Sequence, residues 1–136
     1  LDVLLSDKRT LCIQRGIQLT CYVGGADLSF VEQLDLYSLF GNLLNNAIDA
    51  VSQLPPKQER FITLAARREE NMVTIHAENP CVGTVEFRDG LPQSHRDPNY
   101  HGFGMRSMER IAEKYSGSLA AKQVGDVFYL DIILFS

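Results

Sequence analysis

The sequence has no tryptophan and only three cysteines, Cys12, Cys21 and Cys81, among 136 residues. These cysteines show neither Cys-x-x-Cys nor Cys/His spacing, which argues against a disulfide framework and against a zinc cage. Unpaired thiols are typical of a reducing compartment, so the sequence favours a cytoplasmic location.

An excess of basic residues and a long apolar run are also missing. With 13 basic and 17 acidic residues the net charge is -4, which gives no broad positive field for a nucleic-acid backbone or an anionic lipid surface. We therefore expect no nucleic-acid partner and no direct membrane contact. No apolar run approaches the about 18 residues of a membrane span, and no basic-plus-apolar leader is present. Because Leu1 lies inside an apolar pattern, we expect the chain to be a fragment of a longer protein.

What is present is the composition of a globular domain, with 45% hydrophobic and 22% charged residues. A chain of this length buries roughly two thirds of its unfolded surface, which is enough for one core. We therefore predict a single domain over residues 1–136.

The spacing of apolar residues predicts an α+β order. Helical spacing indicates helices over residues 1–15 and 28–54, and a last helix that follows Gly104 and ends at Gly117. Period-two alternation predicts strands over 17–23, 61–67, 72–77, 119–124 and 127–135, with a charged turn at 68–71. Residues 81–101 have hardly any periodicity, and only 85–87 could form a brief strand. This order predicts a two-layer α/β sandwich, a mixed sheet of about five strands with three helices on one face.

The first candidate site lies on the long helix. Asn42, Asn46 and Asp49 are four and three residues apart, so their side chains share one stripe of the helix. Asparagine is a poor residue for a helix interior, and Glu or Lys would suit a solvated face better. Carboxamide and carboxylate oxygens suit Mg²⁺, which takes its other ligands from phosphate and water. The alternative is a solvated helix face.

The second candidate site is the end of the strand at 72–77, where Asn79 is followed by Pro80, Cys81 and Gly83. A polar side chain at a strand end can address one fixed group of a ligand, such as a purine edge. An ordinary Asn-Pro turn is the alternative.

The third candidate site is the run His101, Gly102, Phe103, Gly104 and Met105, where the irregular stretch meets the last helix. Glycines at a helix N-terminus let backbone N–H groups approach a phosphate, and the helix dipole attracts the anion. A simple loop-to-helix turn is the alternative.

Taken together, the three segments resemble the GHKL superfamily of ATP-binding domains, which includes gyrase, heat-shock chaperone, histidine kinase and mismatch-repair ATPases. Residues 42–50 resemble the N box, residues 79–83 the D-x-G-x-G adenine box, and residues 102–105 the G-x-G-L phosphate box. The resemblance implies a Bergerat-type fold, ATP and Mg²⁺ as cofactors, Asn46 as the metal ligand, and residues 81–101 as a lid over ATP. The binding residues that it implies are Asn42, Asn46, Asp49, Asn79, Cys81, Gly83, His101, Gly102, Phe103, Gly104 and Met105.

Within the superfamily, residues 101–117 resemble sensor histidine kinases of the peptide-pheromone receptor type. This implies a catalytic domain at the cytoplasmic end of a membrane-bound receptor. It would donate the γ-phosphoryl group of ATP to a His on a separate dimerisation domain, with a response regulator downstream. Asn42 stands where hydrolytic members carry Glu, which favours transfer over hydrolysis. Asn79 stands where most members carry Asp, and Cys81 replaces the middle glycine of the adenine box.

Two alternatives remain open. The first is an anti-sigma-factor-type serine kinase, which would carry Glu in the position of Asn42. The second is a non-catalytic nucleotide-sensing or partner-binding module, in which Asn79 and Cys81 would be signs of decay. His76, His95 and His101 are the only histidines, and none lies on a helical stretch with an acidic neighbour, so no phospho-acceptor is evident.

The lid would offer few apolar anchors and open readily in the free protein. Its available cations are Arg88, Arg96 and His101.

Overall fold

The computed structural model describes residues 1–88, 90–92 and 98–136, with residues 98–103 described by their helical backbone alone. The elements follow one another along the chain as α1 (Asp2–Gln14), β1 (Gln18–Tyr22), α2 (Gln33–Ser52), β2 (Phe61–Glu69), β3 (Met72–Pro80), β4 (Phe87–Arg88), β5 (Leu91–Pro92), α3 (Pro98–Lys114), β6 (Ser118–Val124) and β7 (Val127–Phe135).

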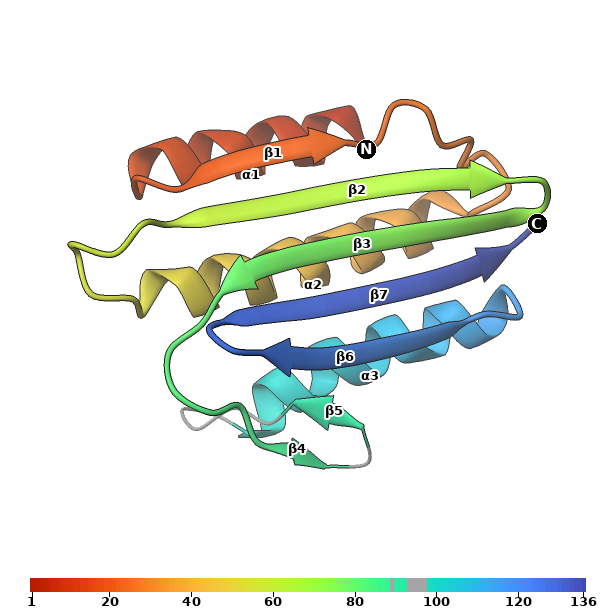
Figure 1. Cartoon of the computed structure of the whole chain (residues 1–136). Helices are drawn as coiled ribbons and strands as arrows, with labels where there is room; N and C mark the ends of the chain where they lie inside the picture. Colours follow the sequence, from red (N-terminus) through yellow and green to blue (C-terminus); the bar gives the residue numbers. More distant parts are fainter. Residues whose placement is uncertain (89, 93–97) are drawn as a thin grey trace.

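Five of the strands form one mixed sheet, which the three helices cover on one face (Figure 1). The strand order is β1-β2-β3-β7-β6, in which β1 pairs with β2 in parallel and the other neighbours are antiparallel. Strands β4 and β5 pair separately as a short hairpin beside β6. The predicted two-layer α+β sandwich is thereby confirmed.

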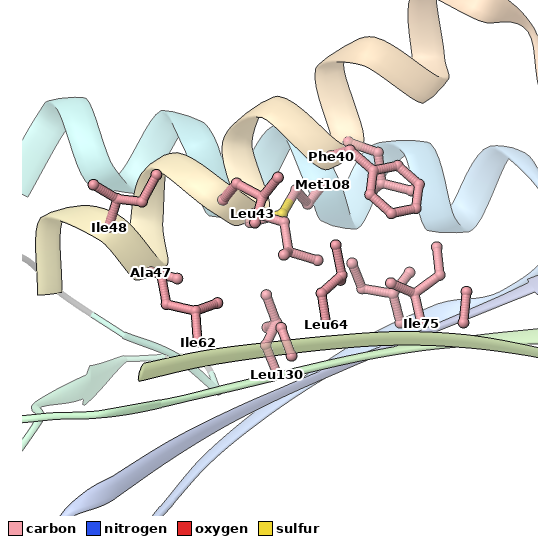
Figure 2. Close-up of a cluster of buried hydrophobic side chains, with 14 of the residues drawn as sticks. Phe40, Leu43, Ala47, Ile48, Ile62, Leu64, Ile75, Met108 and Leu130 are labelled. Carbon is pink, nitrogen blue, oxygen red and sulfur yellow. The ribbon is translucent and has the colours of Figure 1, made fainter. Parts of the chain in front are cut away.

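The core fills the space between the two layers, because each element turns its apolar face inward. Alternate residues of the strands, such as Ile62, Leu64 and Leu130, point toward the helices (Figure 2). Phe40 and Leu43 of α2 project from the other side, at the spacing that places them on one helix face. The period of two along the strands and the period of 3.6 along the helices therefore both place apolar side chains in this single core.

The long helix is shorter than its apolar pattern predicts, because it begins at Gln33 rather than at residue 28. The carboxylate of Asp27 accepts a hydrogen bond from the backbone N–H of Ser29 at 3.0 Å, and the N–H of Val31 donates to the carbonyl of Leu28 at 3.0 Å. These bonds hold a turn in place of a helix. Leu28 and Val31 are nevertheless buried, so their apolar character reflects the core and not the helix.

Two connections also differ from the prediction. The turn expected over residues 68–71 contains only Glu70 and Asn71, because β2 extends to Glu69 and β3 starts at Met72. The brief strand expected at 85–87 lies at Phe87–Arg88, and β5 pairs with it.

The last helix starts earlier than predicted, at Pro98. Proline suits the first turn of a helix because the N–H that it lacks would have no partner there. Gly102 and Gly104 therefore lie inside α3, past its first turn, and the expectation that they form a helix N-terminus is wrong. Residues 81–101 are also less irregular than predicted, since they include β4, β5 and the start of α3. No described helix is long and apolar enough to cross a membrane.

Gly117 marks the place where the chain leaves α3 and passes close to β7. A Cβ atom on this residue would lie 1.6 Å from the carbonyl oxygen of Ile133, which no side chain can occupy. The N–H of Phe135 donates to the carbonyl of Tyr115 at 2.8 Å, which ties the helix end to the same strand. Glycine is therefore required here by a close backbone approach.

Candidate functional site

The three candidate segments converge at one end of the sandwich. In Figure 1 the C-terminal end of α2, the C-terminal end of β3 and the N-terminal end of α3 all lie on the left side. Helix α2 contacts both α3 and β3 directly. The stripe on α2, Asn79 on β3 and Gly104 on α3 therefore lie at the same end of the molecule, although they are far apart in the sequence.

Asn42 forms the described contact between the stripe and the glycine-rich segment. A Cβ atom on Gly104 would lie 3.5 Å from Oδ1 of Asn42, so the two helices approach closely at this point. The amide nitrogen of Asn42 donates to the hydroxyl of Ser38 at 3.3 Å, and that hydroxyl lies 3.4 Å from the hydroxyl of Ser107 on α3. Asn42 is thus oriented by its own helix and placed against α3.

The other two residues of the stripe continue toward the same end. Asn46 and Asp49 are half-buried, whereas Asn45, one position away, is exposed, and its Oδ1 accepts from Nζ of Lys8 at 2.6 Å. Among the described residues no group of three or more His, Cys, Asp or Glu side chains could hold a metal ion. A cation at Asn46 would use neutral and anionic oxygen donors from the stripe, which is the donor chemistry that Mg²⁺ prefers.

Asn79 is the one polar side chain that the described part of the structure buries, with 2% of its surface exposed. Its amide nitrogen donates to the carbonyl of Pro80 at 2.9 Å. With the amide nitrogen on the side of Pro80, the carbonyl oxygen of the Asn79 carboxamide points the other way, where it can accept from an amino group. A buried amide that is held by the backbone is suited to read one edge of a planar ligand.

Cys81 follows in the same wall of the site and is also buried. Burial raises the pKa of its thiol and the Asp126 carboxylate raises it further, whereas a hydrogen bond with Gln123 acts in the opposite direction. The thiol is therefore neutral and serves as a small apolar surface. Gly83 has a φ of +68°, a conformation that glycine adopts without strain.

Residues 81–88 and 90–92, the start of the predicted lid, are anchored more firmly than the sequence predicts. The ring of Phe87 stacks on Phe128 of β7 with 6.4 Å between centroids and an angle of 19° between planes. Leu91 is buried, and Val85 packs against the core. The expectation of few apolar anchors is wrong for this half of the predicted lid, because Val85, Phe87 and Leu91 meet the edge of the sandwich, although Val82 is exposed.

Sequence reasoning gave no role in the site to Gln123, whose side chain bonds to the lid start. The alternation of β6 provided a signal, because Leu119, Ala121 and Gln123 share the face toward the helices. An amide side chain is unusual on this apolar face of β6, but only the fold shows which groups Gln123 contacts.

The remaining candidate residues lie in the core, at the surface, on the other face of the sheet or outside the described residues. Met105 is 2% exposed and packs in the core, and Arg88 is exposed on β4. The side chains of His101 and Phe103, and the whole of His95 and Arg96, lie outside the described residues, and of Gly102 only the helical backbone is described. His76 lies on the sheet face opposite the helices, with its Nδ1 2.6 Å from a carboxylate oxygen of Asp131.

Comparison with solved structures shows that this sandwich has the fold of histidine kinase catalytic domains. The histidine kinase AdeS of Acinetobacter baumannii is 12% identical with a TM-score of 0.71, over 98% of this chain and 61% of that chain. The catalytic domain of the histidine kinase ThkA, in a nucleotide-free form, is 13% identical with a TM-score of 0.71, over 98% of this chain and 92% of that chain. The blue-light-activated histidine kinase EL346 of Erythrobacter litoralis is 15% identical with a TM-score of 0.64, over 93% of this chain and 38% of that chain.

The sequence itself assigns the family. The family model described as the GHKL domain matches residues 31–135, which is most of the chain, and the protein therefore belongs to the GHKL domain family. No curated protein matches the sequence. The chain spans 61% of the length of the AdeS chain and 38% of the EL346 chain.

Proposed function

We propose that this chain is the ATP-binding catalytic domain of a two-component sensor histidine kinase, which binds Mg-ATP and donates its γ-phosphoryl group to a His on a separate dimerisation domain. The observation that carries the proposal is the placement of the buried Asn79 at the same end of the sandwich as the contact between Asn42 and Gly104. Membership of the GHKL family supports it.

The adenine ring is assigned to the end of β3. The carbonyl oxygen of Asn79 would accept from the exocyclic amino group, and the neutral thiol of Cys81 would contact the ring edge. A carboxamide is a weaker acceptor than the carboxylate found in most family members, so we expect lower affinity but the same preference for adenine over guanine.

The phosphates are assigned to the space beside α2 and α3. Asn46 would hold Mg²⁺, with Asp49 as the next polar group of the stripe and Gly104 leaving room for the phosphate chain. The ion neutralises phosphate charge when it is bound. Asn42 has no carboxylate with which to take a proton from water, which favours transfer to a side chain over hydrolysis. The same residue argues against a serine kinase of the anti-sigma-factor type.

The phospho-acceptor is assigned to another domain. His76 pairs with Asp131 on the opposite face of the sheet from the helices, so it does not face the site. The acceptor would be supplied by the dimerisation domain, with a response regulator downstream and the whole assembly in the cytoplasm.

Titration calorimetry with ATP, in the presence and absence of Mg²⁺, tests the proposal on this chain. We expect ATP binding that Mg²⁺ strengthens, and much weaker binding of GTP. Failure to bind ATP under both conditions would remove the nucleotide site. Binding without transfer of labelled γ-phosphate to a His-bearing dimerisation domain added in trans would favour the non-catalytic module.

A further inference from the structure

The side chain of Gln123 lies in a row of three residues that crosses the sheet at the proposed adenine end. In the antiparallel pairing of β6, β7 and β3, Phe128 stands opposite Gln123 on one side and opposite Asn79 on the other. Residues directly opposite one another in antiparallel strands point to the same face of a sheet. Gln123, Phe128 and Asn79 therefore share the helix-facing side, with the phenylalanine between the two amides.

Gln123 uses both ends of its carboxamide on backbone groups. Its Nε2 donates to the carbonyl of Gly83 at 2.7 Å and to the carbonyl of Gly125 at 3.0 Å, and its Oε1 accepts from the N–H of Val85 at 2.7 Å. Two of these three bonds fix the lid start, and the third fixes the β6–β7 turn. One side chain thus joins the lid to the hairpin that carries Phe128.

The same turn also holds the chain immediately after Asn79. The N–H of Cys81 donates to the carbonyl of Asp126, next to Gly125, at 2.8 Å. Two residues beyond the last bond of Gln123, the ring of Phe87 stacks on Phe128. The segment from Cys81 to Phe87 is therefore held along its length against one hairpin.

We infer that Gln123 is a positioning residue of the nucleotide site, which holds residues 83–85 against the β6–β7 hairpin so that Asn79 and Cys81 meet adenine in a preformed arrangement. The inference rests on the proposed function, because it assigns Gln123 to the adenine end of that site. Preformed contacts strengthen binding, because the ligand does not have to order the loop. The Mg²⁺ end of the site lies on α2 and does not depend on Gln123.

The test compares Gln123→Met, which keeps the length of the side chain but removes its hydrogen bonds to the lid, with two controls. Gln18→Met makes the same change on the exposed end of β1. Asp35→Asn lowers stability at the far end of the helices, where Asp35 binds Lys114 and Tyr115. Calorimetry gives the affinity for ADP with and without Mg²⁺, thermal unfolding gives stability, and amide exchange reports on residues 82–86.

We expect Gln123→Met to bind ADP about 10-fold more weakly under both conditions, since it loses two hydrogen bonds to the lid backbone. The factor by which Mg²⁺ strengthens binding stays unchanged, amide exchange of residues 82–86 becomes faster, and both controls bind as the unaltered chain does. Gln123→Ala is expected to behave in the same way if the methionine perturbs packing.

Unchanged ADP affinity in both Gln123 variants, with or without faster exchange, would overturn the inference and leave the proposed function intact. A loss of the Mg²⁺ effect, or an equal loss of affinity in Asp35→Asn, would also overturn it, because the effect would then not be local to the adenine end. Absence of ADP and ATP binding in the unaltered chain would overturn the proposed function, and the inference with it.

Discussion

The two ends of the helical layer are held together by different chemistry. At one end Glu32, Asp35, Lys114 and Tyr115 form a network that we name the helix clamp. Asp35 accepts from the ammonium of Lys114 and from the hydroxyl of Tyr115, each at 2.7 Å. The same hydroxyl accepts from the N–H of Glu32 at 2.9 Å. At the other end, among the described residues, α2 and α3 meet through Asn42, Gly104 and two serine hydroxyls 3.4 Å apart.

Because the two ends differ in chemistry, we expect one end to contribute to the stability of the fold and the other to nucleotide binding. Charged groups of the helix clamp satisfy one another, so they fix α2 against α3 without a ligand. The opposite end presents amides and a glycine, to which the proposed function assigns Mg²⁺ and the phosphates of ATP. Variants at the clamp end should therefore change the free energy of unfolding, and variants at the site end should change nucleotide affinity.

The largest effect is expected at Gly117, beside the helix clamp. Gly117→Ala would place a methyl group 1.6 Å from the carbonyl oxygen of Ile133, so the strand or the helix end must move. We expect a loss of more than about 3 kcal/mol in the free energy of unfolding, measured by urea denaturation. Gly41→Ala on α2 is the matched control, because nothing lies within 4 Å of its Cβ position. It should stabilise the protein by about 0.5–1 kcal/mol. Similar stability of the two variants would contradict the close approach.

At the site end, Asn46→Ala should remove the strengthening of ATP binding by Mg²⁺, a fall of about 10- to 100-fold in calorimetric affinity with the metal present. The fold should remain intact, because Asn46 is only half-buried. Asn45→Ala is the matched control, since Asn45 is exposed and binds Lys8. A folded Asn46→Ala protein with unchanged Mg-ATP affinity would refute the assignment of the metal site.

A smaller effect is expected from the charge of the helix clamp. Hydrogen bonds from Lys114 and Tyr115 hold the pKa of Asp35 below its ordinary value of 3.8. Because the folded-state pKa is depressed, the stabilisation is fully present above the unfolded-state pKa and is lost as pH falls through the folded-state pKa. Asp35→Asn should cost about 1 kcal/mol at pH 7 and less at pH 3, measured by urea unfolding at each pH. An equal cost at both pH values would show that the charge of Asp35 is not what joins the helices.

The smallest effect concerns the lid. Phe87→Ala removes the stack on Phe128, which is worth about 0.5–1.5 kcal/mol, so trypsin should cut after Arg88 a few times faster in the nucleotide-free protein. Cleavage after Lys57, in the α2–β2 connection, serves as the internal reference. Mg-ATP analogues should slow cleavage after Arg88 more than ADP does, because a ligand that binds the closed lid shifts the population toward it. Equal cleavage with saturating nucleotide would rule out a lid.

Local sequence patterns predicted most of the secondary structure, because each element turns one apolar face to a single core. The strands at 61–67 and 127–135 follow directly from alternation. The pattern failed where a residue is buried without belonging to a helix, as at Leu28 and Val31. The pattern also failed at the start of α3. Gly102 and Gly104 are typical of a loop, but the helix already begins at Pro98 and contains both glycines.

The sequence alone determined the family, through three short motifs, and the order of the elements, through the spacing of apolar residues. It also determined which faces are apolar. Only the tertiary structure decided that the buried amide of Asn79 shares a row with Phe128 and Gln123, and that Asp35 meets Lys114 and Tyr115 across about 80 residues of sequence. The physical reason is that strand register and helix packing are set by the whole core at once, whereas a periodic pattern reports only the neighbours of each residue along the chain.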